Sequence, residues 1–185
     1  MYSFVTMLSV VSVSLISPVA HAEGETIENR MVLSSDDQIQ ILDATQAPYR
    51  SICFLYINNI VRGSGVVIGK NAILTTREVA SAAANGEAIN IKVNEGRTSK
   101  DDYNGTFYGK EIKYSPDNQD IAIVYLNPNE KGGNIGDEDS IVSYISSSDL
   151  QEDALVKIIG YPVNKPFATM WETTGTVISE KDEMI

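Results

Sequence analysis

The sequence predicts an all-β protein. Short runs of β-branched and aromatic residues alternate with turn residues along most of the chain, and residues 89–93 alternate strictly between apolar and polar side chains. Helical character is confined to one brief stretch, residues 77–84. Many short strands separated by tight turns are typical of a β-barrel or a β-sandwich.

Each predicted element is bounded by turn residues. The predicted strands are residues 52–57, 65–68, 89–93, 121–126, 155–159 and 170–178. The turn signals are Asn85-Gly86, Asn94-Glu95-Gly96, Asn104-Gly105, Ser115-Pro116-Asp117-Asn118 and Gly132-Gly133-Asn134. Asn85-Gly86 also ends the predicted helix, and residues 132–139 and 146–153 are predicted as acidic, polar loops.

The N-terminus predicts an export signal. Residues 1–19 contain no charged side chain, and the apolar run ends at Ala20-His21-Ala22, which fits cleavage before Glu23. The alternative is an uncleaved membrane helix, but the run breaks at Pro18, short of the ~20 apolar residues that a span requires. We therefore expect residues 1–22 to be a signal peptide and the protein to be secreted.

Charge and cysteine content narrow the class of partner and the compartment. The formal net charge is −11, and all of it lies from Glu23 onward, which argues against nucleic acid or an anionic membrane as a partner. The lone Cys53 cannot form an internal disulfide, and a secreted protein without disulfides is commoner in bacteria than in animals. Cys53 lies in an apolar run, so we expect a buried, inert thiol.

Three segments, in this order, resemble a known family. Residues 74–79 follow the strand-like residues 65–69 and resemble the Leu-Thr-x-x-His-Val run that carries the catalytic histidine of chymotrypsin-like proteases, but the histidine position is Glu78. Residues 120–124 resemble the segment that carries the triad aspartate, which would be Asp120; from the residues alone, an ordinary turn or strand-edge aspartate is the favoured interpretation. Residues 160–172 are similar to a Gly-Tyr-Pro to Thr-Met-Trp-Glu segment of the bacterial glutamyl endopeptidases.

This resemblance implies a fold and a domain layout. It implies a chymotrypsin-like protein of two Greek-key β-barrels with the active site between them, extracellular cleavage after acidic residues, and kinship with exfoliative toxins. The expected layout is a signal peptide (1–22), a short propeptide (23–31), a complete first barrel (32–148) and the start of a truncated second barrel (149–185). We expect residues 52–126 to close the first barrel and residues 155–178 to add at most a hairpin without partner strands.

The catalytic positions depart from the family pattern. The family's serine nucleophile lies in a Gly-Asn-Ser-Gly segment beyond the Trp-Glu region, and the sequence ends at Ile185 before such a segment. Gly63-Ser64-Gly65 lacks the pattern of a nucleophile turn and is predicted to be a strand start. Glu78 is a poor replacement base, because a carboxylate with a pKa of ~4.3 has little affinity for a serine proton at neutral pH. We therefore expect an inactive member of the family.

The remaining functional predictions follow from composition. Neither Asp101-Asp102 nor Asp137-Glu138-Asp139 has the spacing of a calcium loop, so we predict no metal and no cofactor. A protein substrate or inhibitor is the expected partner, and we expect a monomer. Two alternatives stay open: a non-catalytic secreted protein that binds a partner, and a decayed gene product without function.

Overall fold

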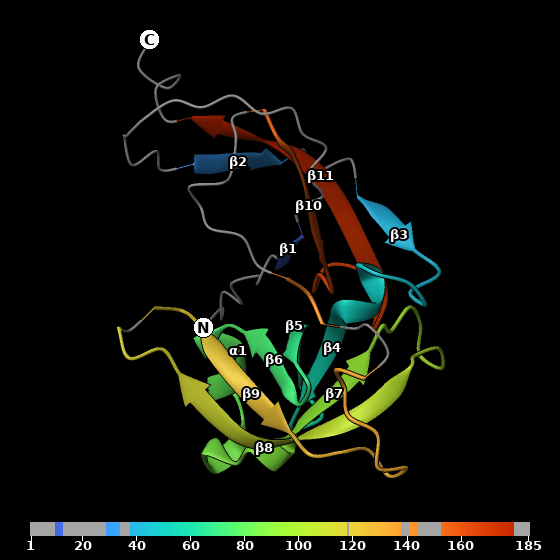
Figure 1. Ribbon diagram of the computed structural model, residues 1–185, viewed down its shortest axis with the longest axis vertical. Helices are drawn as coiled ribbons and strands as arrows, with labels where there is room; N and C mark the ends of the chain where they lie inside the picture. The colour runs from blue at the N-terminus through green and yellow to red at the C-terminus, as the bar shows by residue number, and fades with distance from the viewer. Residues whose placement is uncertain are drawn as a thin grey trace.

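The described residues form two β-sheets, a closed six-stranded barrel and an open five-stranded sheet (Figure 1). The computed structural model describes residues 10–12, 29–33, 38–117, 119–137, 141–143 and 153–179. Its helices are short: α1 (Arg77–Ser81) and the single 3₁₀ turns η1 (Tyr49–Ser51), η2 (Ala84–Gly86) and η3 (Ala88–Asn90). The prediction of an all-β protein is confirmed.

The barrel is built from six antiparallel strands. They are β4 (Ile52–Ile57), β5 (Val61–Gly69), β6 (Ala72–Thr75), β7 (Ile91–Glu95), β8 (Gly105–Tyr114) and β9 (Ala122–Leu126), in the order β4-β5-β6-β9-β8-β7. Pairing of β4 with β7 closes the barrel, and pairing of β6 with β9 joins strands that are distant in sequence. Closure removes the free strand edges that would otherwise attract other chains.

Apolar side chains from every strand fill the barrel. The interior residues are Cys53, Leu55, Ile57, Val67, Ile73, Ile91, Val93, Phe107, Ala122, Val124 and Leu126. Burying each large side chain stabilises the fold by roughly 1.5–3 kcal/mol. The predicted closure of residues 52–126 is confirmed.

The second sheet is centred on the hairpin of β10 (Leu155–Gly160) and β11 (Met170–Ser179). β1 (Val10–Ser12) pairs with β10, whereas β2 (Asn29–Leu33) and β3 (Ile39–Ile41) pair with β11. The prediction that the hairpin lacks partner strands was therefore wrong. Its partners come from the N-terminal part of the chain, where the sequence indicated a signal peptide, a propeptide and the beginning of the first barrel. Most of residues 1–37 lie outside the described residues, and the predicted cleavage sites stay predictions.

The second sheet packs on the outer face of β4. Side chains along β4 alternate, so that Ile52 and Phe54 point away from the barrel interior and contact Ile159, Tyr161 and Met170. The rings of Phe54 and Tyr161 meet edge to face with centroids 5.2 Å apart. One apolar core therefore joins the two sheets.

Tyr161 fixes this contact with two hydrogen bonds. Its backbone N–H donates to the hydroxyl of Ser64 on β5 at 2.9 Å, and its own hydroxyl accepts the backbone N–H of Arg97 at 2.9 Å. The Gly-Tyr-Pro turn is thus an anchor of the second sheet on the barrel. Ser64 thus has a structural partner in this anchor, and it lies inside β5 rather than at the strand start that the sequence predicted.

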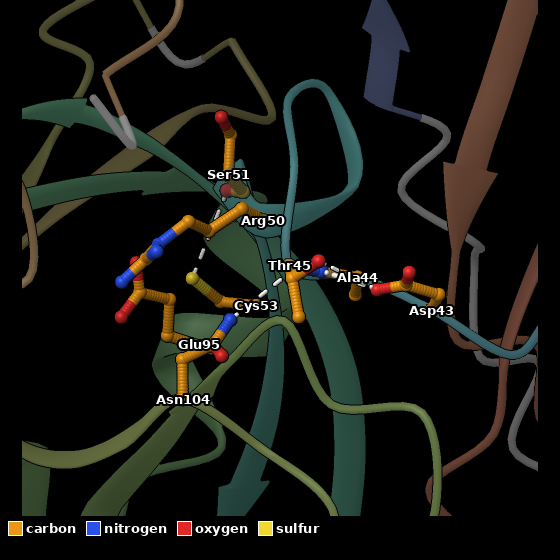
Figure 2. A network of polar contacts seen from close by, with 8 residues as sticks. All are labelled: Asp43, Ala44, Thr45, Arg50, Ser51, Cys53, Glu95 and Asn104. Carbon is orange, nitrogen blue, oxygen red and sulfur yellow. Dashed lines mark hydrogen bonds and ion pairs between the residues drawn. The ribbon is translucent and has the colours of Figure 1, made fainter. Parts of the chain in front are cut away.

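The segment just before β4 takes part in a network of polar contacts (Figure 2). Arg50 Nε lies 3.4 Å from Glu95 Oε1, and the amide of Asn104 donates to the carbonyl oxygen of Ala44 at 3.3 Å. Cys53 is fully buried beside this network, and burial, helped by the charge of Glu95, raises the pKa of its thiol well above the ordinary value. The prediction that Cys53 is buried is confirmed, and the inertness of its thiol stays a prediction.

Candidate functional site

The first half of the site is the junction between β6 and α1. β6 ends at the buried Thr75, and the next residue, Thr76, has extended backbone angles. The side-chain oxygen of Thr76 accepts the backbone N–H of Val79 at 3.1 Å, which is a helix N-cap. Glu78 therefore lies in the first turn of α1, with its side chain partly exposed.

Asp120 forms the second half of the site. It lies in the loop between β8 and β9, just before β9 begins, and the pairing of Thr75 with Ala122 brings this loop to the start of α1. Asp120 Oδ1 accepts the backbone N–H of Glu78 at 3.0 Å. The structure thus brings together the two site residues that the sequence indicated. The contact runs from a carboxylate to the backbone, and it does not involve the Glu78 carboxylate.

Arg77 connects the two halves. Its Nη2 donates to the carbonyl oxygen of Ser115 at 2.6 Å, and its Nε donates to the carbonyl oxygen of Gln119 at 3.3 Å. Its guanidinium lies over the ring of Tyr114, 5.0 Å from the ring centroid. The sequence analysis missed Arg77, because its partners are backbone carbonyl groups about forty residues away along the chain, which leave no signal in the local sequence.

The side chains at this site supply carboxylates and a guanidinium, but no imidazole. The sequence has one histidine, His21, which lies outside the described residues. The hydroxyl of Ser64 is hydrogen-bonded to Tyr161, and Cys53 is buried in the barrel. The described part of the chain therefore places the Asp120 carboxylate on the backbone N–H of Glu78 and contains no imidazole that could act as a base.

Two of the acidic side chains that the sequence analysis weighed as calcium ligands, those of Asp102 and Asp137, bind within their own loops, whereas residues 138 and 139 lie outside the described residues. Asp102 accepts a hydrogen bond from the Thr98 hydroxyl. Asp137 accepts the backbone N–H of Asn134 at 2.8 Å, and this hydrogen bond is the main cause that lowers the pKa of the Asp137 carboxyl. Within the described ranges, no group of three or more His, Cys, Asp or Glu side chains is arranged to hold a metal ion.

Comparison with known proteins finds a matching family of peptidases and similar bacterial peptidases. A family described as a trypsin-like peptidase domain matches residues 63–184. The chain is 38% identical over 152 residues to a glutamyl endopeptidase of Staphylococcus epidermidis, covering 80% of this chain and 54% of that protein. It is 32% identical over 158 residues to a glutamyl endopeptidase of Staphylococcus aureus strain MW2, covering 83% of this chain and 48% of that protein. The chain thus spans about half the length of the curated relatives it matches.

Solved structures share the fold. A Glu endopeptidase in complex with MPD superposes with a TM-score of 0.64 at 22% identity, covering 80% of this chain and 71% of that chain. An inactivated protease paralogue of the scabies mite superposes with a TM-score of 0.53 at 14% identity, covering 72% of this chain and 60% of that chain. The predicted chymotrypsin-like fold and the resemblance to glutamyl endopeptidases are confirmed.

Proposed function

We propose that this chain, which belongs to the trypsin-like peptidase family, is a secreted relative of the glutamyl endopeptidases in which Glu78 takes the histidine position and which therefore does not hydrolyse peptides. The observation that carries the proposal is the contact between Asp120 Oδ1 and the backbone N–H of Glu78 at 3.0 Å. This contact supports the assignment of residue 78 to the histidine position and of Asp120 to the aspartate position, independently of the sequence motif.

The chemical consequence comes from the difference between a carboxylate and an imidazole. In the triad mechanism the histidine takes the proton of the nucleophile and becomes a cation, which the neighbouring aspartate stabilises. Glu78 would become neutral on taking that proton, so Asp120 would have no cation to stabilise, and a carboxylate is in general a much weaker base than an imidazole. Losing the histidine of a triad costs about 10⁶-fold in kcat, which would put hydrolysis below routine detection.

The same proposal includes the location and the partner. We propose an extracellular protein whose partner, if any, is a protein substrate or inhibitor, and which is a monomer. The net charge of −11 supports this choice, because it disfavours nucleic acid and anionic membrane surfaces. Among the described residues, no helix has both the length and the apolar character needed to cross a bilayer.

The test is a peptidase assay on the protein purified from the medium of its host. Reporter peptides with a glutamate or an aspartate before the scissile bond are incubated with the wild-type protein and with the Glu78→Ala variant, and a staphylococcal glutamyl endopeptidase serves as the positive control. We expect no cleavage by either form of the protein. Cleavage by the wild type that disappears in Glu78→Ala would show that Glu78 acts as the base, and the proposal would be abandoned.

A further inference from the structure

We propose that Arg77 is a positioning residue: it holds the loop between β8 and β9 so that the Asp120 carboxylate stays on the backbone N–H of residue 78. This inference goes beyond the proposed function and does not depend on it. It concerns how the site is built, whichever side chain residue 78 carries.

The geometry of the Arg77 side chain carries the inference. Two of its N–H donors reach carbonyl groups of the loop, that of Ser115 next to β8 and that of Gln119 immediately before Asp120. The guanidinium is planar and presents its N–H groups as a rigid fork, and its face is stacked on Tyr114 at 5.0 Å. Arg77 therefore fixes the backbone on the N-terminal side of Asp120.

The position of Arg77 along the chain links this clamp to the site. Arg77 and Glu78 are the first two residues of α1. One helix turn thus holds the loop through the side chain of Arg77 and receives the Asp120 carboxylate through the backbone N–H of Glu78. Asp120 is exposed, so forming this contact costs conformational entropy of both its backbone and its side chain. A loop backbone that Arg77 already holds removes most of the backbone part of this cost.

The neighbouring amide in the same helix turn offers an internal control. The backbone N–H of Val79 donates to the side-chain oxygen of Thr76 at 3.1 Å and has no contact with Asp120. A loss of the helix turn would expose both amides. A loss of Asp120 alone would expose the amide of Glu78 and leave that of Val79 protected.

The experiment is amide hydrogen exchange, read residue by residue by NMR, on the whole chain and three variants. Asp120→Ala removes the acceptor and should speed exchange at Glu78 by about tenfold, as expected for a lost hydrogen bond to a charged group. Arg77→Gln should give most of that acceleration, and Arg77→Lys should do the same, because a single ammonium cannot span the two carbonyl groups. In all three variants the Val79 amide should exchange at the wild-type rate.

Three outcomes would overturn the proposal. Unchanged exchange at Glu78 in Arg77→Gln would mean that the loop holds Asp120 without Arg77. Wild-type exchange in Arg77→Lys would mean that a positive charge suffices and the two-carbonyl geometry does not matter. Parallel acceleration at Val79 would mean that Arg77 only stabilises the helix turn.

Discussion

Replacing Tyr161 with Phe should lower the stability of the whole protein, although it removes a single oxygen atom. The substitution keeps the ring that packs against Phe54 and leaves the buried backbone N–H of Arg97 without its acceptor, which lies 2.9 Å away in the wild type. An unpaired buried donor costs about 1–3 kcal/mol. A loss of about 2 kcal/mol lowers the Tm of a domain of this size by about 4–8 °C.

Thermal unfolding followed by two signals would measure this effect. The only tryptophan, Trp171, lies in β11 and reports on the second sheet, and far-ultraviolet circular dichroism reports on both sheets. Tyr56→Phe is the matched control, because the Tyr56 hydroxyl donates to the carbonyl oxygen of Asn59 at 2.6 Å at an exposed position where water replaces it. The control should change the stability by less than about 0.5 kcal/mol. Equal Tm values for Tyr161→Phe and Tyr56→Phe would refute the anchoring role of Tyr161.

The same variant predicts a pH dependence. Burial raises the pKa of the Tyr161 hydroxyl well above its ordinary value of 10.0. A raised pKa in the folded state means that the stability contribution is complete below the unfolded pKa and is lost as the pH rises beyond it. The stability gap between the wild type and Tyr161→Phe should therefore be full at neutral pH and should narrow as the pH rises above about 10. Urea unfolding at several alkaline pH values measures the gap, and a constant gap would contradict the prediction.

Two further pairs of substitutions test the site and the barrel. Glu78→His should leave the urea midpoint of unfolding almost unchanged, because the Glu78 carboxylate has no hydrogen bond among those of the described residues, whereas Asp120→Ala should cost about 1 kcal/mol by freeing a backbone N–H at a helix start. A larger effect of Glu78→His than of Asp120→Ala would contradict this assignment. Gly109→Ala should destabilise the barrel by about 1–3 kcal/mol, because the new Cβ would lie 2.1 Å from the carbonyl oxygen of Ala88. In the control Gly69→Ala the nearest atom would be at 3.7 Å, so equal midpoints for the two alanine variants would refute the steric argument.

Local sequence patterns predicted the strands whose side chains are mostly apolar. β4 begins and ends where the sequence indicated, because five of its six residues are buried. β8 was not predicted, since Phe107 and Gly109 are its only buried residues and three of the other eight, Lys110, Glu111 and Lys113, are charged. β6 has only four residues, too few for a clear pattern. The predicted helix over residues 77–84 ends earlier as an α-helix, because the Asn58 side chain binds the carbonyl oxygen of Ala82 and the backbone N–H of Ala84.

The candidate site was predictable only in part. Glu78 and Asp120 are 42 residues apart, and a resemblance to known proteins indicated that they meet. The kind of contact between them was not predictable, since it depends on a backbone N–H that any residue would supply. The role of Arg77 and the pairing of β11 with β3 likewise depend on backbone groups brought together by the fold. Contacts of this type leave no pattern in the side chains.

The hydrogen bonds around residue 78 stabilise the fold without involving the side chain of that residue. Asp120 holds residue 78 through the backbone, and Arg77 holds the loop through backbone carbonyl groups, so neither contact requires a particular side chain at position 78. A change of that side chain alters the reactive group while the surrounding structure keeps its hydrogen bonds. Selection removes substitutions that destabilise the fold below the level needed for function. A substitution at position 78 that leaves these hydrogen bonds in place is not removed for that reason. On the proposed assignment of residue 78 to the histidine position, the fold keeps the Asp120 contact without an imidazole, so this contact by itself is no evidence of peptidase activity.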